Sequence, residues 1–243
     1  MITKSISIII PLYNEERTAK ILLEKVDKVK IPLKKEIIII ESNSIDGTKE
    51  IVKKFSEKRK DTRVIYEKKP EGKGEAVIKG LKLVTSDIII IQDGDLEYDV
   101  NEYPRLIEPF IKQNAKVVFG SRHLGMQKWK IRSYKKDQLF AHLLNMGHVI
   151  YTTLFNVLYG TKMTDPATMY KLFRRELIQG KKFKTRGFDF DWELTAKLVK
   201  EGNKVIEVPV HYISRSRKEG KKIRFFRDGI NVLIAIIRFR MTD

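Results

Sequence analysis

Short apolar runs alternate with amphipathic stretches through the first 120 residues. The runs, at residues 6–10, 36–40, 63–67, 87–91 and 116–120, read as strands. The stretches between them, at about 15–29, 46–59, 73–84 and 101–113, carry apolar residues at helical spacing. Strands that are apolar on both faces and separated by helices are typical of a parallel sheet covered on both sides. The pattern therefore predicts an α/β fold.

Beyond residue 120 the alternation weakens. We expect a basic, mobile loop at 121–137, a long apolar helix at 138–159, a helix at 189–202, a strand at 204–212 and a basic helix at 221–240. No internal repeat or linker interrupts the chain. A length of 243 residues is enough for one hydrophobic core, so we expect a single domain over residues 1–243.

The net charge of +18 is distributed unevenly. Residues 1–120 hold 23 basic and 20 acidic side chains, whereas residues 121–243 hold 26 and 11. The second half is therefore expected to face an anionic partner: phosphates, nucleic acid or a lipid surface. The chain has no cysteine, which excludes disulfides and thiolate metal sites.

The apolar segments are too short to cross a bilayer. The first residues do not have the apolar length of a signal peptide, and the longest apolar run near the end covers only 232–237, where a span needs about 20 residues. Segments 138–159 and 221–240 nevertheless suit a lipid interface, because basic amphipathic helices lie in the headgroup plane. The alternative is that both simply pack on the sheet.

Acids, amides, glycines and a lysine follow the ends of the predicted strands, where ligands of α/β sheets bind. The loop "QDGDLEYD" contains Asp93, Asp95 and Glu97. If this segment is extended, alternate side chains point the same way and the three carboxylates could converge. Crowded carboxylates repel unless they surround a cation, and oxygen ligands suit Mg²⁺ or Mn²⁺. The alternative is a turn whose Asp and Gly residues only satisfy the backbone.

Two further loops offer groups for a ligand. Glu41 ends the second predicted strand and could accept hydrogen bonds from NH groups of a ligand. Lys73 lies between two glycines just before a helix, where a phosphate would be favoured. The glycine spacing is not that of a P-loop.

Six motifs occur in the same order as in a known family: "IIIPLYNEE", "ESNSIDGT", "GKGEAVIKG", "QDGDLEYD", "FGSR" and "GKKIRFFRDGI". Together they resemble family 2 glycosyltransferases, in particular the dolichyl-phosphate mannose and glucose synthases, over about residues 5–240. The resemblance implies the GT-A fold, a mostly parallel mixed sheet flanked by helices, with amphipathic interface helices near the C-terminus. Residues 1–120 would form the nucleotide-sugar-binding part, and residues 121–243 the acceptor-binding and membrane-interface part.

The resemblance also implies roles for individual residues. On the donor side, the nucleotide pocket would be lined by Pro11, Tyr13 and Glu15, with Glu41 reading the base and Lys73 nearby. Asp93 and Asp95 fill the metal-binding Asp-x-Asp, with Glu97 where relatives often carry glutamine. The motif "ESNS" replaces the paired aspartates of many relatives, which leaves the preferred base open.

On the acceptor side, Arg122 would approach the donor sugar or diphosphate and Arg132 the acceptor phosphate. With Asp95, these two arginines are the expected catalytic residues. A basic segment that folds over the nucleotide and acceptor phosphates would contribute Arg215, Arg217, Lys221 and Lys222. We do not expect this chain to contain the C-terminal transmembrane helices that some relatives have.

The expected activity is an inverting, metal-dependent transfer of a hexose or N-acetylhexosamine. The donor would be a nucleotide diphosphate-sugar and the acceptor a polyprenyl phosphate of the dolichyl type, at the cytoplasmic face of a membrane. Mg²⁺ or Mn²⁺ would neutralise the charge of the leaving diphosphate. A lipid phosphate arrives ionised and needs no general base.

Two other functions stay open. A saccharide hydroxyl acceptor would need a general base, for which Asp165, Asp189 and Asp191 are candidates. A non-enzymatic basic module for nucleic acid or membranes would leave the acidic loops without a role, and we expect no nucleic-acid partner. The four histidines, 123, 142, 148 and 211, show no spacing typical of metal ligands.

Overall fold

A seven-stranded sheet forms the centre of the computed structural model, which describes residues 3–126, 130–134, 138–215 and 225–242. The strand order is β3-β2-β1-β4-β6-β5-β7. In chain order the strands are β1 (Ser5–Leu12), β2 (Lys34–Glu41), β3 (Thr62–Tyr66), β4 (Ile88–Ile91), β5 (Val117–Ser121), β6 (Lys171–Arg174) and β7 (Val205–Pro209). The predicted α/β fold is confirmed.

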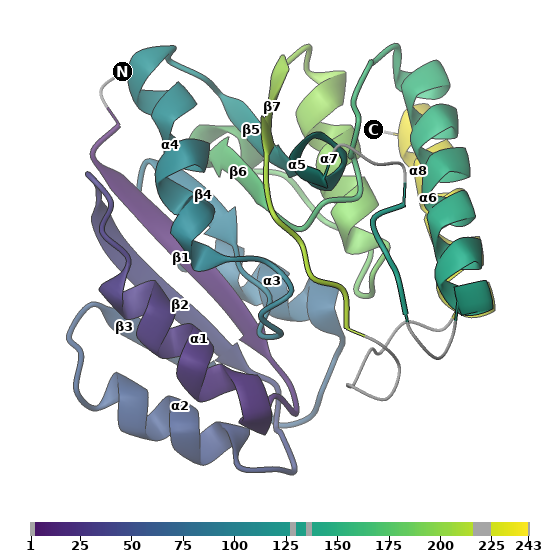
Figure 1. The fold of residues 1–243 in the computed structure, drawn as a ribbon. Coiled ribbons are helices and arrows are strands. Elements are labelled where there is room, and N and C mark those ends of the chain that lie inside the picture. Colours follow the sequence, from purple (N-terminus) through teal and green to yellow (C-terminus); the bar gives the residue numbers. More distant parts are fainter. Residues whose placement is uncertain (1–2, 127–129, 135–137, 216–224, 243) are drawn as a thin grey trace.

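Helices cover both faces of the sheet (Figure 1). They are α1 (Glu16–Lys28), α2 (Thr48–Ser56), α3 (Lys73–Leu81), α4 (Tyr103–Lys112), α5 (Arg122–Met126), α6 (Gln138–Tyr159), α7 (Phe190–Lys200) and α8 (Phe225–Met241). Two 3₁₀ turns lie at Val100–Glu102 and Arg175–Ile178. A basic loop was expected over 121–137, but this segment contains the five-residue helix α5 near its start. That part of the prediction was wrong.

The isoleucine runs explain the central strands, because both of their faces are covered. In β1, Ile8 and Ile10 belong to the core layer shared with α1 and α4, whereas Ile9 belongs to the layer shared with α3, α7 and α8. All three side chains are fully buried. Alternating burial of a continuous apolar run is what a parallel strand between two helical layers requires.

Strand β6 makes the sheet mixed. It lies between β4 and β5 and runs antiparallel to both, while the other paired strands are parallel. Its sequence, "KLFR", is short and begins and ends with basic residues, so hydrophobic patterning did not indicate it. Lys171 and Arg174 are nevertheless buried at its two ends.

Helices α6 and α8 pack against each other at one side of the molecule (Figure 1). The Tyr151 hydroxyl of α6 donates a hydrogen bond to the Gly229 carbonyl of α8 at 3.1 Å, and Tyr159 donates to the Ile236 carbonyl at 3.0 Å. In the described part of the chain, neither these helices nor any other has the length and apolarity to span a bilayer.

Candidate functional site

A cavity of about 500 Å³ opens beyond the carboxyl ends of β1 and β4 and extends to α6, α7 and α8. The cavity thus lies where the strand-end rule predicts a ligand site. Ten of the residues expected from the sequence line it: Pro11, Tyr13, Glu15, Lys73, Asp93, Asp95, Glu97, Arg122, Arg132 and Arg215.

An arginine from the segment after β7 forms ion pairs with two acids in the wall of this cavity. Arg215 Nη2 lies 3.1 Å from Asp95 Oδ2, and Nη1 lies 3.0 Å from Glu15 Oε2. Burial raises the pKa of Asp95 to about 7, and the negative charges of Asp93 and Glu97 add to this rise, against the opposing effect of Arg215. The local negative charge therefore exceeds what Arg215 compensates.

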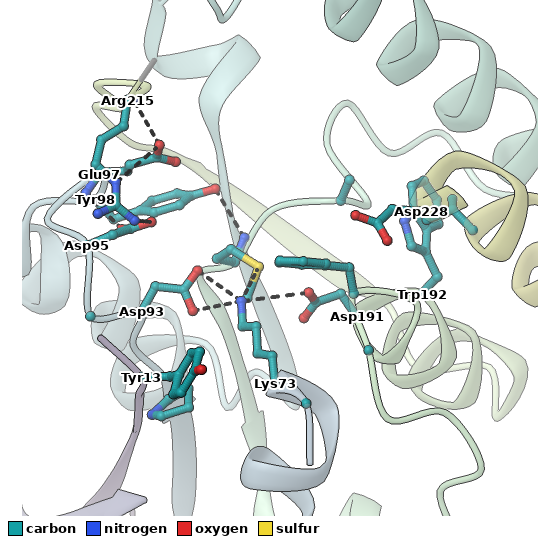
Figure 2. A pocket seen from close by; sticks show the side chains of 18 of the residues that line it. Tyr13, Lys73, Asp93, Asp95, Glu97, Tyr98, Asp191, Trp192, Arg215 and Asp228 are labelled. Atoms are coloured by element: carbon teal, nitrogen blue, oxygen red, sulfur yellow. Dashed lines mark hydrogen bonds and ion pairs between the residues drawn. The ribbon is translucent and has the colours of Figure 1, made fainter. Parts of the chain in front are cut away.

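Lys73 lies inside the same wall and bridges two acids (Figure 2). Its Nζ is 2.7 Å from Asp93 Oδ1 and 3.9 Å from Asp191 Oδ2. Burial alone would lower the pKa of Lys73, but the charges of Asp93 and Asp191 raise it above its usual value. Lys73 is thus a permanent cation at the start of α3. Its expected contact with a ligand phosphate stays a prediction.

Glu97 is directed away from the two aspartates. Its Oε2 accepts a hydrogen bond from the Tyr212 hydroxyl at 2.6 Å, and its Oε1 accepts one from the Arg215 amide at 2.7 Å. The chain between Asp95 and Glu97 is not extended, because Leu96 has a φ of 59°. The premise that alternate side chains point the same way was therefore wrong at this loop.

In the portions of the chain that the structure describes, no three acids or histidines are grouped to hold a metal ion. The chemistry and charge of the site still suit one. In the described part of the chain, five carboxylates, those of Glu15, Asp93, Asp95, Glu97 and Asp191, lie at most 3.9 Å from Lys73 or Arg215. Negative charges therefore outnumber these two cations. Hard oxygen donors with this excess fit Mg²⁺ or Mn²⁺, which Asp93 and Asp95 could hold if Arg215 moved aside. Metal binding by Asp93, Asp95 and Glu97 stays a prediction.

Arg122 reaches the cavity as half of a buried ion pair. Its Nε and Nη2 each lie 2.7 Å from an oxygen of Asp165, and both side chains are almost completely buried. Burial would raise the pKa of Asp165, but the Arg122 guanidinium holds it well below its usual value. Asp165 is therefore a poor proton acceptor, and a base role for it is disfavoured. Burial also lowers the pKa of the neighbouring His148 to about 3.

Arg132 is more available to a ligand than Arg122, which is paired with Asp165. It lines the cavity, its Nη1 donates a hydrogen bond to the Leu144 carbonyl at 3.4 Å, and its buried Nε has no hydrogen-bond partner. A guanidinium with a buried, unsatisfied donor suits an anionic ligand. Its role toward an acceptor phosphate stays a prediction.

Not every expected residue reaches the cavity wall. Glu41 is fully buried behind it, where Oε1 accepts a hydrogen bond from the Ser44 amide at 2.8 Å and Oε2 has no partner. Its neighbour Ser42 lines the cavity instead. Arg217, Lys221 and Lys222 lie outside the described residues.

The candidate bases differ from one another in position. Asp189 precedes α7 and accepts a hydrogen bond from the Gly187 amide at 3.1 Å. Asp191, two residues on, is buried and lines the cavity. Among the histidines, His123 stacks on His148 with ring centroids 4.8 Å apart.

Sequence reasoning missed one acid of the site. Asp228 lines the cavity from α8, opposite Asp93 and beside Trp192 (Figure 2). Because 221–240 was read only as an interface helix, its single acid received no role. An isolated carboxylate within a basic, apolar helix was the signal that could have indicated it.

Comparison with known proteins supports the sequence resemblance. The model of the family described as glycosyl transferase family 2 matches residues 7–180. A dolichol-phosphate mannosyltransferase of Pyrococcus furiosus is 28% identical over 216 residues, 89% of this chain and 58% of that protein. An undecaprenyl-phosphate 4-deoxy-4-formamido-L-arabinose transferase of Photorhabdus laumondii is 27% identical over 179 residues, 72% of this chain and 51% of that protein. The chain thus spans little more than half of these two relatives.

A further relative and two solved structures extend the comparison. An uncharacterised protein of Methanocaldococcus jannaschii is 28% identical over 214 residues and matches 84% of this chain and 87% of its own. The glucosyl-3-phosphoglycerate synthase of Mycobacterium tuberculosis with Mn²⁺, UDP and phosphoglyceric acid superimposes with a TM-score of 0.72 at 18% identity, covering 98% of this chain and 79% of that one. The same enzyme with Mg²⁺ and UDP gives 0.70 at 17% identity, covering 97% and 79%. The predicted GT-A class is confirmed.

Proposed function

Because this chain belongs to glycosyl transferase family 2, we propose that it transfers one hexose or N-acetylhexosamine from a nucleotide diphosphate-sugar to a polyprenyl phosphate of the dolichyl type. Two relatives bear names that specify dolichol phosphate or undecaprenyl phosphate as substrates. We infer that this chain uses the same class of acceptor.

One observation carries the proposal: a single cavity joins an acidic end to an end suited to a lipid phosphate. The acidic end contains Asp93 and Asp95. The other end contains Arg132 and is walled by Leu144 of α6 and Val232 of α8. A cation beside apolar walls fits a phosphate attached to a hydrocarbon chain, whereas a free sugar would need polar walls.

The proposed reaction is a direct displacement with inversion. An ionised oxygen of the lipid phosphate attacks C1 of the sugar, and the bond from C1 to the diphosphate oxygen breaks. The electron pair leaves with the nucleoside diphosphate, and no proton has to move. Asp93 and Asp95 would hold Mg²⁺ or Mn²⁺, which supplies charge neutralisation at the diphosphate. Arg132 would orient the acceptor phosphate.

The exposed faces of α6 and α8 support a position at a membrane surface. On α6, Ile150 and Val157 are 58% and 75% exposed, and on α8 Ile230 and Ile234 are 58% and 54% exposed. Exposed arginines accompany them at the end of α8. Apolar side chains with arginines at the rim match the acyl and phosphate layers of a bilayer.

A second candidate keeps the donor site but uses a saccharide hydroxyl as acceptor. Asp191 favours it, because its buried Oδ1 has no hydrogen-bond partner and its side chain lines the cavity. Such a carboxylate could accept the proton of an attacking hydroxyl.

Incubation with radiolabelled donors distinguishes these functions. The protein is mixed with UDP-glucose, UDP-GlcNAc or GDP-mannose, dolichyl phosphate and either Mg²⁺ or Mn²⁺. Label in the organic phase with at least one donor is the expected result. Label that reaches added saccharides but never the lipid would favour the hydroxyl acceptor, and no transfer with any donor would overturn the proposal.

A further inference from the structure

Lys171 is a fully buried cation that the proposed reaction leaves without a role. It begins β6, its Nζ donates a hydrogen bond to the Thr168 carbonyl, and it lies 5.4 Å from the centre of the Phe119 ring. Burial lowers its pKa to about 8, while the charge of Asp191 opposes this change. Lys171 therefore remains protonated at neutral pH, although burial of an ammonium group is unfavourable.

The nearest acid to this ammonium is Asp191 of the cavity wall. Lys171 Nζ lies 3.9 Å from Asp191 Oδ1, and Lys73 Nζ lies 3.9 Å from Oδ2 (Figure 2 shows the Lys73 side). Both distances are too long for a hydrogen bond. The carboxylate is therefore held by charge from two sides, and its Oδ1, on the Lys171 side, is buried without a hydrogen-bond partner. The Asp191 side chain is 9% exposed and lines the cavity.

Charge and hydrogen-bonding capacity limit which groups of a ligand can bind to the Asp191 carboxylate. An ionised diphosphate and an ionised lipid phosphate carry acceptors only, and a carboxylate repels both. The hydroxyl groups of the transferred sugar are donors. A carboxylate in the cavity wall that is held only by long ion pairs can still accept a hydrogen bond, so a hydroxyl that donates one gains specificity against analogues that lack that hydroxyl.

We propose that Lys171 is a positioning residue for sugar recognition. Its charge holds Asp191 in the cavity wall, where the Asp191 carboxylate accepts a hydrogen bond from a hydroxyl of the transferred sugar. This inference rests on the proposed function, since it requires a nucleotide-sugar donor. If Lys171 were purely structural, filling space beside Phe119 and bonding to Thr168, its replacement would change the Kd of a nucleotide-sugar and the Kd of its nucleotide by the same factor.

Calorimetric titration separates these roles without a lipid acceptor. With MnCl₂ present, UDP is compared with UDP-glucose and UDP-GlcNAc, and GDP with GDP-mannose. The quantity of interest is the Kd of the nucleotide-sugar divided by the Kd of its nucleotide. For Lys171→Met we expect this ratio to rise at least fivefold while nucleotide affinity stays within twofold. Asp191→Asn should give the same result, and the double variant should be no worse than either single one.

Matched variants guard against simple destabilisation. Arg174→Met removes the other buried cation of β6, whose Nε donates a hydrogen bond to the Ala115 carbonyl at 3.0 Å, and should leave the ratio unchanged. If Lys171→Met does not fold, Lys171→Gln keeps a donor for Thr168 without the charge and should raise the ratio equally. An unchanged ratio in the folded Lys171 variant, or additive effects with Asp191→Asn, overturns the inference alone. If the wild type binds none of these sugar nucleotides, the proposed function fails as well.

Discussion

Arg215 and Asp95 form an ion pair in the wall of the cavity, with Nη2 and Oδ2 3.1 Å apart. They are 120 residues apart in the chain. The guanidinium therefore neutralises an oxygen that a divalent cation bound to Asp95 could use, and it also binds Glu15 at 3.0 Å. Arg215 and a metal ion are therefore expected to compete for the same carboxylate.

Replacement of Arg215 should strengthen metal binding in the absence of nucleotide. Arg215→Ala removes the competing positive charge, so Mn²⁺ affinity should rise about tenfold, or about 1.4 kcal/mol. The charge of Arg215 also lowers the pKa of Asp95, which is about 7 in the wild type, so this pKa should rise in Arg215→Ala. The two proteins should therefore be compared at pH 8.5, where Asp95 is ionised. Electron paramagnetic resonance of free Mn²⁺ measures the affinity. Arg105→Ala, which removes an exposed arginine of α4, is the control. Equal affinity in wild type and Arg215→Ala would refute the competition.

Asp95→Asn should abolish transfer without unfolding the protein. Loss of one group that stabilises transition-state charge costs about 10²–10³ in rate, so the labelled-lipid assay should fall at least 100-fold. Burial raises the pKa of Asp95 from 3.8 to about 7, so its charged form is unfavourable in the folded state. Stability at pH 7.5 should therefore not decrease. Asp27→Asn changes a distant acid paired with Arg59 and serves as the control. Retained activity in Asp95→Asn would dismiss this residue from the reaction.

The central sheet could be predicted from the sequence because β1, β2 and β4 are buried on both faces, and such strands have long isoleucine runs. Strand β6 could not be predicted in this way. That strand has four residues, with Lys171 and Arg174 at its two ends, both buried. Arg174 donates a hydrogen bond to the Ala115 carbonyl, 59 residues away, which is tertiary information.

For the site, the rule that ligands bind at the ends of parallel strands predicted that Glu15, Lys73 and Asp93 lie at one edge of the sheet, and all three line one cavity. Two features of the site could not be predicted from the sequence. A left-handed Leu96 is uncommon for a residue other than glycine, and it redirected Glu97. The pairing of Arg215 with Asp95 depends on how a segment after the last strand crosses the cavity, which no local pattern records.

Glu97 is expected to stabilise the segment after β7. Glu97→Ala leaves the Tyr212 hydroxyl and the Arg215 amide without their acceptor, and two charge-assisted hydrogen bonds are lost. The free energy of unfolding should fall by about 3 kcal/mol, as measured by urea denaturation. Tyr212→Phe removes one of the two bonds, so the double variant should cost clearly less than the sum of the singles. A loss below about 0.5 kcal/mol in Glu97→Ala would contradict this structural role.

Membrane binding should depend on the apolar face of α8. Ile234 is 54% exposed, and Ile234→Glu places a charge where the acyl layer would lie. We expect the partition of the protein onto vesicles with about 30% anionic lipid to fall at least tenfold in co-sedimentation, since a charge costs several times more than a methylene gains. Ile111→Glu changes a 48% exposed isoleucine on α4 and is the matched control. Similar losses in both variants, or no binding by the wild type, would argue against this face as the contact.

His148 should make the protein sensitive to mild acid. Its pKa is about 3 in the folded state, against an ordinary value of 6.5, because burial disfavours the charged ring. Between pH 6.5 and 3 the unfolded chain therefore binds a proton that the folded chain does not, and stability is lost as the pH falls. His148→Gln cannot bind this proton. Its deficit in unfolding free energy relative to wild type, measured in urea at pH 7.5, 6.0 and 5.0, should shrink as the pH decreases. His142→Gln removes an exposed imidazole of the same helix as a control. A deficit of His148→Gln that stays constant over this range would show that burial does not exclude the proton.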